Sequence, residues 1–159
     1  MDEEKLNRLP PDVKKQFVKL ALKLSEKKTK TKVNDDFLTF VKHVWPEFIE
    51  GKHHKEIAEK FNQIARGEIK RLIINMPPRH TKSEFASFLL PSWMVGRKPD
   101  LKIIQTTHTT ELAIRFGRKA KTLMDSQEYK QVFKTRLRED SQAAGKWETE
   151  QGGEYYAAG

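Results

Sequence analysis

Two short apolar runs with a helical pattern between them constrain the fold of this chain more than any other feature. Residues 72–75 read Leu-Ile-Ile-Asn, a compact apolar run typical of a buried parallel strand, and the run stops at Pro77 and Pro78. Helical spacing resumes after Lys82 and ends near Gly96, and residues 101–106 form a second strand candidate. A strand–helix–strand unit of this length predicts an α/β fold with a parallel sheet covered by helices.

Three amphipathic helices are predicted before this unit. Residues 12–26, 35–45 and 53–66 place apolar side chains at helical spacing, and Pro46 and Gly67 end the second and third helices. Asp35 is the predicted N-cap of the second helix, because its carboxylate can accept from the first-turn N–H groups. We expect the first helix to dock on the main body.

A basic stretch at residues 26–32 marks the predicted internal boundary. It reads Glu-Lys-Lys-Thr-Lys-Thr-Lys and has no apolar anchor, which favours a linker or a flexible arm. The predicted division is therefore a helical arm and basic linker at residues 1–34, followed by the main domain at residues 35–159.

The second half of the chain predicts one more helix and a hairpin. A helix capped by Thr109 or Thr110 extends to about residue 123 and carries a strongly basic outer face. Residues 146–156 are compatible with a small hairpin that turns at Gly152 and Gly153.

Composition excludes several classes of protein. The chain has no cysteine and no helical HExxH pattern, which removes disulfide scaffolds and gives zinc chemistry no support. Its apolar runs are far shorter than the ~20 residues that cross a bilayer, and the charged start Met-Asp-Glu-Glu-Lys lacks the apolar core of a secretory signal. The formal charge of +9 favours a polyanionic partner such as nucleic acid, although a basic surface without a partner is an equal reading.

The loop between the first strand candidate and the helix after it carries the chemistry. A nucleoside triphosphate needs a nest of backbone N–H groups, a helix N-terminus, a lysine for the outer phosphates and a hydroxyl for magnesium. Lys82 and Ser83 stand where a phosphate-binding loop places the last two groups. Met76 and Thr81 replace both glycines of the general pattern, so these residues alone also fit a proline-rich turn with an exposed lysine.

The wider sequence resembles the N-terminal ATPase region of tailed-bacteriophage terminase large subunits, the motors that package viral DNA. Residues 72–84 look like the variant Walker A loop of that family, with two prolines and an arginine before the Lys-Ser pair. Further landmarks extend the resemblance from about residue 37 to residue 159. They are Trp45-Pro46, His53-His54, Ile57-Ala58-Glu59, Pro91-Ser92-Trp93, Gly96-Arg97, Leu112-Ala113, Tyr129, Val132-Phe133, Trp147 and Gly152-Gly153.

The resemblance implies a fold and an activity. It implies an ASCE-type P-loop NTPase with a mainly parallel sheet flanked by helices, ATP and Mg²⁺ as cofactors, and ATP hydrolysis. Family members carry a Walker B aspartate, a catalytic glutamate and then an RNase H-like nuclease domain that cuts DNA. None of these is found here, so residues 35–159 are expected to be a partial ATPase domain, incomplete at the C-terminus and inactive in hydrolysis by itself.

The resemblance also assigns roles to individual residues. Lys82 becomes the phosphate lysine, Ser83 the magnesium ligand and Arg79 the arginine directed at the γ-phosphate. Arg115, or alternatively Arg118, is a candidate arginine finger for a neighbouring subunit. The remaining nucleotide-binding candidates are Pro78, His80, Thr81 and Glu84 in the loop, and on the adenine side His54, with His53 and Trp45 as weaker choices.

The leading functional expectation is a viral DNA-packaging ATPase. Its implied partners are double-stranded DNA, the portal protein, the terminase small subunit and further copies in a homo-oligomeric ring, with no membrane. The implied location is the host cell cytoplasm, transiently docked on the procapsid portal. The alternative is a non-enzymatic basic nucleic-acid-binding module, whose DNA binding would be indifferent to ATP. A different P-loop enzyme, such as a helicase or kinase, would need motifs that the sequence does not show.

Overall fold

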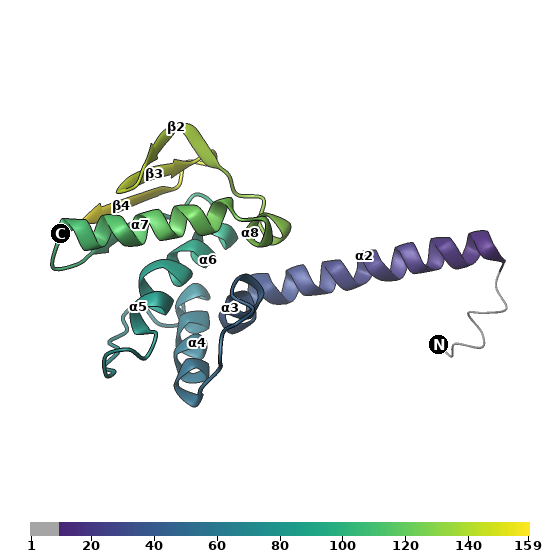
Figure 1. Cartoon of the computed structure of the whole chain (residues 1–159), viewed down its shortest axis with the longest axis horizontal. Coiled ribbons are helices and arrows are strands. Elements are labelled where there is room, and N and C mark those ends of the chain that lie inside the picture. The colour runs from purple at the N-terminus through teal and green to yellow at the C-terminus, as the bar shows by residue number, and fades with distance from the viewer. Residues whose placement is uncertain (1–9) are drawn as a thin grey trace.

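The computed structural model describes residues 10–159, which form a mixed α/β structure with one long projecting helix (Figure 1). The charged first residues, 1–9, lie outside the described part. The helical elements are α2 (Pro11–Asp35), α3 (Phe37–Val44), α4 (Lys52–Ala65), α5 (Lys82–Glu84), the π-helix η1 (Phe85–Leu89), α6 (Leu90–Arg97), α7 (Thr110–Asp125) and α8 (Gln127–Val132).

The strands form one four-stranded mixed sheet. Their bounds are β1 (Lys102–Thr106), β2 (Leu137–Ala143), β3 (Lys146–Thr149) and β4 (Glu154–Ala158), in the order β1-β4-β3-β2. β1 pairs with β4 in parallel, whereas the pairs β3–β4 and β2–β3 are antiparallel. The predicted hairpin is confirmed in β3 and β4, and Gly152 in its turn has a φ of 86°.

The sheet differs from the prediction in two respects. It is mixed rather than mainly parallel, and the parallel partner of β1 is β4 rather than residues 72–75. Those residues form no strand, because no described segment pairs with their backbone. Their side chains nevertheless alternate as in a strand, since Leu72 and Ile74 pack against the core while Ile73 is 86% exposed.

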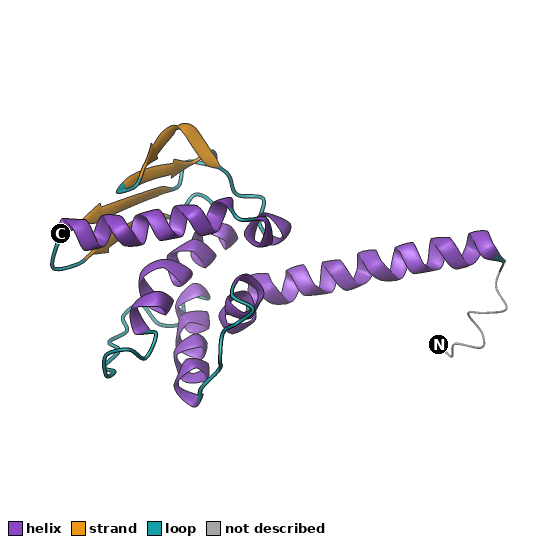
Figure 2. Ribbon diagram, viewed as in Figure 1, coloured by secondary structure: helices purple, strands orange, loops and turns teal. Residues whose placement is uncertain are grey.

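Helix α2 corrects the prediction for the N-terminal region. Residues 26–32 are helical and continue the helix from Pro11 to Asp35, so the expectation that they form a linker or flexible arm is wrong, whereas the division of the chain after residue 34 stays a prediction. The predicted docking of this helix is also wrong, because α2 projects away from the body and only its C-terminal end reaches it (Figures 1 and 2). That end is held by buried Val33, whose carbonyl accepts a hydrogen bond of 3.0 Å from Trp93 Nε1.

An aromatic cluster fills the core between the helices. The Phe37 ring makes edge contacts with Phe61, Phe85 and Trp93 at centroid distances of 5.1 to 5.4 Å. Such edge-to-face pairs add to the stabilisation by burial, and all four side chains are almost fully buried. The helix that follows the loop is thereby fixed against α3 and α4.

Helix α3 begins with a fully bonded cap. Asp36, one residue after the predicted cap, accepts from Thr39 N at 2.7 Å and from Asn62 Nδ2 at 2.8 Å. The Asn62 amide oxygen in turn accepts from Phe37 N at 2.8 Å. Burial raises the pKa of Asp36, but these hydrogen bonds to the carboxylate outweigh burial and lower the pKa overall.

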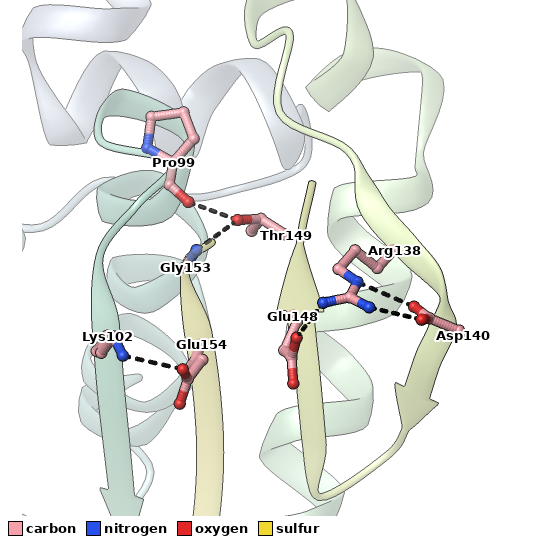
Figure 3. A network of polar contacts seen from close by, with 8 residues as sticks. All are labelled: Pro99, Lys102, Arg138, Asp140, Glu148, Thr149, Gly153 and Glu154. Atoms are coloured by element: carbon pink, nitrogen blue, oxygen red, sulfur yellow. Dashed lines mark hydrogen bonds and ion pairs between the residues drawn. The ribbon is translucent and has the colours of Figure 1, made fainter. Parts of the chain in front are cut away.

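Helix α7 packs against one face of the sheet, and the opposite, open face exposes Ile104 and Tyr156 besides the ion pairs drawn in Figure 3. On the open face Arg138 bonds to Asp140 and Glu148, and Lys102 bonds to Glu154. At the turn that opens β4, Thr149 Oγ1 donates to the Pro99 carbonyl at 2.6 Å and accepts from Gly153 N at 2.8 Å. This pair ties the hairpin to the segment that enters β1. Among residues 10–159 no helix is long and apolar enough to span a membrane.

Candidate functional site

The predicted phosphate loop curls around a hollow of its own. Residues 77–84 line a cavity of about 400 Å³, and no residue from elsewhere in the described chain contributes to its wall. The loop follows the extended residues 72–76 and ends where helix α5 begins at Lys82. A contiguous loop that curls around an open hollow of this size can surround a phosphate group.

The backbone of this loop presents unused donors. The N–H groups of Arg79 and of residues 81–84 donate to no acceptor within residues 10–159, and residues 78 and 79 form a turn that ends at His80. The sign of φ alternates along the loop, because Arg79 and Thr81 have positive φ values of 64° and 57° while His80 and Lys82 do not. Alternating left- and right-handed residues turn successive N–H groups toward a common point, which is the anion-binding arrangement called a nest.

Lys82 and Ser83 lie at the end of the nest. The Lys82 ammonium reaches back across the loop and donates to the Met76 carbonyl at 3.3 Å. This single long bond leaves the ammonium with two more N–H donors. Ser83 is exposed on the cavity wall, and its hydroxyl makes no hydrogen bond within the described chain. The roles expected of Lys82 and Ser83 stay predictions.

Thr81 requires an explanation, because a β-branched residue with positive φ is a steric outlier. Its side chain is held at two points. Thr81 Oγ1 donates to the His80 carbonyl at 2.7 Å and lies 2.6 Å from His54 Nε2. The His80 ring adds a third restraint through a contact of 2.9 Å between Nδ1 and the Pro78 carbonyl. The loop is therefore fixed by side chains where most phosphate loops rely on glycine.

The hydrogen bonds of His54 define its protonation state. The Gly51 N–H donates to His54 Nδ1 at 2.8 Å, so this nitrogen carries no proton. The neutral ring then bears its proton on Nε2 and donates it to Thr81 Oγ1, whose own proton is directed to His80. A neutral His54 thus satisfies both neighbours, whereas a protonated ring would lose the Gly51 bond.

Burial keeps His54 neutral. Its ring lies 4.7 Å from the Phe48 ring and 5.1 Å from the Phe85 ring, centroid to centroid. Burial lowers the pKa of His54 below its ordinary value, and the charges of His53 and His80 lower it further while Glu50 opposes them. Both ring nitrogens are engaged, so the structure gives His54 the role of supporting the loop. The adenine contact predicted for it stays a prediction.

The helix after the loop carries an unusual turn. Residues 85–89 form a π-helix, and Leu90 N bonds to the Phe85 carbonyl. Pro91 follows directly and cannot donate to the carbonyl four residues before it, so the widened turn accommodates the proline without breaking the helix. Lys119 of α7 bonds to both Glu84 carboxylate oxygens, at 3.0 and 2.9 Å, and ties α7 to the loop end.

Arg115 and Arg118 are exposed on α7 and make no hydrogen bond or ion pair with the rest of residues 10–159. Arg115 lies one helical turn before Lys119 and therefore on the same side of α7 as the Glu84 contact. Arg118 is rotated away from that side. Of the two finger candidates, Arg115 is the one on the loop-facing side, and both assignments stay predictions.

A larger apolar groove adjoins the loop. It has a volume of about 830 Å³ and lies between α4 and residues 72–76, with Ile57 and His53 among its lining residues. The extended segment that forms one wall leads directly into the loop. Of the adenine-side candidates, His53 faces this groove, while Trp45 packs on the Phe48 ring at 5.5 Å.

The donors of the loop fit Mg·ATP. Residues 10–159 contain no group of three or more His, Asp or Glu side chains able to hold a metal by themselves. Magnesium bound with a nucleotide does not need one, because phosphate oxygens and water supply most of its ligands and a single hydroxyl completes the set. The unpaired N–H groups, the Lys82 ammonium and the Ser83 hydroxyl supply the matching chemistry.

Comparisons with protein-family models, curated proteins and solved structures find no match for this chain.

Proposed function

We propose that this chain binds Mg·ATP in the loop of residues 76–84. The observation that carries the proposal is the set of backbone N–H groups at Arg79 and residues 81–84, which have no acceptor in the described chain and lie in a loop that lines a hollow of its own. Unpaired N–H groups in a nest at a helix start attract phosphate. The two left-handed residues, Arg79 and Thr81, store strain that such a ligand site would account for.

Each loop residue has a role in this proposal. Lys82 exchanges its long bond to the Met76 carbonyl for the β- and γ-phosphates, and Ser83 ligates Mg²⁺. Arg79 is exposed at the rim, from which its guanidinium can reach the γ-phosphate. The base occupies the apolar groove beside residues 72–76, with His53 on its wall.

We further propose that the chain is the ATP-binding part of a terminase large subunit. The support is the order of the sequence landmarks around the Pro-Pro-Arg loop, together with a loop geometry suited to phosphate. In this proposal ATP hydrolysis in a ring of subunits drives double-stranded DNA into a procapsid at the portal. The exposed arginines of α7 then face a neighbouring subunit or DNA phosphates.

Calorimetric titration of the folded chain with Mg·ATP tests the binding proposal. Lys82→Ala and Arg79→Ala remove the two cationic groups of the loop, whereas Lys134→Ala removes an exposed lysine outside it. We expect Lys82→Ala to weaken binding by at least about 100-fold, because charge-assisted bonds to phosphate are worth ~3 kcal/mol. Lys134→Ala should bind as the parent chain does. A folded chain that binds no Mg·ATP, or binds equally after Lys82→Ala, refutes the loop as a nucleotide site.

Titration of the same variants with duplex DNA, with and without Mg·ATP, separates the alternative function. The net charge of +9 also supports a basic nucleic-acid-binding module in which the loop is only a turn. That module would bind duplex DNA with the same affinity with and without Mg·ATP, and Lys82→Ala would change DNA binding no more than Lys134→Ala does.

A further inference from the structure

Helix α2 exposes apolar side chains far from the proposed nucleotide site. Val13, Phe17, Leu20 and Leu24 are between 39% and 56% exposed although the helix is fully formed. Only the C-terminal end of the helix contacts the body, so no part of the described chain covers these side chains (Figure 1). Such uncovered apolar side chains, four of them large and in one helix, are typical of an interaction surface.

The spacing of these residues indicates what kind of surface it is. Val13, Phe17, Leu20 and Leu24 are separated by four, three and four residues, the d-a-d-a spacing of a coiled-coil seam. The next seam positions are Lys27 and Thr31, so the apolar seam ends well before the base of the helix. The four apolar residues form a narrow stripe that suits a partner helix, and the exposed Val18 and Leu22 lie on other sides of α2 and do not widen it into the broad apolar face of a helix lying in a membrane surface.

The charges beside the seam select the partner. With Val13 at d, the e and g positions beside the apolar seam are Lys14, Gln16, Ala21 and Lys23, and Lys28 and Lys30 take the same positions where the seam has ended. The helix as a whole carries eight lysines and three acidic residues. Two copies of α2 would place like charges opposite one another at these positions, and a helix with Glu or Asp there would pair favourably.

We infer that α2 is a docking helix for an acidic amphipathic helix of another protein, which packs on the seam formed by Val13, Phe17, Leu20 and Leu24. The inference concerns a surface separate from the phosphate loop and does not depend on nucleotide binding. Apolar contacts along the seam supply the affinity, and the lysines at the e and g positions supply the preference for an acidic partner.

A pair of designed peptides tests this inference on the whole chain. One peptide has about four heptads with Leu at a and d and Glu at e and g, and its control has Lys at e and g. The seam variant is Phe17→Ala with Leu20→Ala. The matched control is Val18→Ala with Leu22→Ala, which removes equally exposed apolar residues outside the seam. Alanine keeps the helix propensity high, and circular dichroism checks that both variants retain α2.

We expect the Glu peptide to bind the parent chain and the control variant equally, and the Lys peptide to bind neither. The seam variant should bind the Glu peptide at least about tenfold more weakly, because it lacks two apolar side chains that the bound peptide would bury. The inference is overturned if the Glu peptide does not bind, or if both variants lose binding alike. Self-association of the chain in sedimentation that the seam variant abolishes would assign the seam to a second copy instead. Seam-dependent binding to 3:1 phosphatidylcholine–phosphatidylglycerol vesicles or to duplex DNA, without peptide binding, would likewise overturn it.

Discussion

His54 Nε2 donates to Thr81 Oγ1 across 2.6 Å and so joins the first turn of α4 to the left-handed residue of the loop. The general phosphate-loop pattern has glycine at the position of Thr81, because glycine adopts positive φ without steric cost. Here an imidazole positioned by the Gly51 N–H holds a threonine in the same conformation. His54 is therefore a positioning residue for the loop, and its effect is measurable without assuming any base contact.

The first prediction concerns this pair. His54→Ala should weaken Mg·ATP binding by about tenfold, the equivalent of one lost hydrogen bond that holds Thr81 in a strained conformation. Thr81→Gly should restore most of that loss in the double variant, since glycine needs no support at positive φ. Calorimetric titration of the parent chain, both single variants and the double variant gives the coupling free energy between positions 54 and 81 for Mg·ATP binding. A double variant as weak as the sum of both single effects would contradict the assignment.

The second prediction concerns pH. The pKa of His54 is lowered in the folded chain from its ordinary value of 6.5, so below pH 6.5 the unfolded chain takes up the proton first. The contribution of neutral His54 to the free energy of unfolding is therefore present in full above pH 6.5 and is lost as the pH falls through the lowered pKa. Denaturant unfolding between pH 7.5 and 4.5 should show that the parent chain and His54→Ala differ less in free energy of unfolding as the pH falls. A difference that stays constant with pH would contradict the neutral state assigned to His54.

The third prediction compares two neighbouring glycines. A Cβ at Gly153 would lie 2.3 Å from the Pro99 carbonyl oxygen and 2.8 Å from that of Leu101, whereas a Cβ at Gly152 would meet nothing within 4 Å. Gly152→Ala should cost only about 1 kcal/mol, for the left-handed φ of 86°. Gly153→Ala should cost at least about 2 kcal/mol, because two backbone carbonyls of the segment that enters β1 must move. Equal unfolding midpoints for the two variants would contradict the close packing of the hairpin on β1.

The fourth prediction compares two fully buried tryptophans. Trp93 Nε1 donates to the Val33 carbonyl, whereas Trp147 Nε1 has no partner in the described chain. Trp93→Phe should therefore destabilise the chain by about 1 kcal/mol more than Trp147→Phe, because only the former leaves a buried carbonyl unpaired. The smaller ring introduced by Trp147→Phe would keep a stacking contact with Tyr155, since the Trp147 and Tyr155 rings are stacked at 4.7 Å. Thermal unfolding of both variants measures the difference.

Local sequence signals predict much of the architecture. Helical periodicity locates α3, α4 and α7, and Thr109 caps α7 as expected by accepting from Leu112 N. Glycines at 152 and 153 locate the hairpin turn. The loop also lies where the sequence predicts it, between an extended segment and a helix that begins at Lys82. Each of these features is set by residues close together in the chain, which is why a single sequence reveals them.

Features that depend on distant partners escape prediction from the sequence. Residues 72–75 have the composition of a buried strand, but a strand also needs a neighbour, and the described chain supplies none. The lysine-rich residues 26–32 suggest a linker because they lack apolar anchors, yet lysine is a good helix former and the helix simply continues through them. The support of Thr81 by His54 spans 27 residues of sequence, and no local pattern signals it.

Helix α2 projects from the body as a long arm that is attached at its C-terminal end. Its twenty-five helical residues extend for ~37 Å at 1.5 Å per residue. At the attached end, Trp93 Nε1 donates a hydrogen bond to the Val33 carbonyl. Trp93 belongs to the same helical run that begins at Lys82 in the loop. A load applied at the free tip of α2 would thus reach that run through the Val33–Trp93 hydrogen bond and through the packing of α2 on α3, α6 and α8, so a partner bound at the tip would act at a distance on the loop of residues 77–84.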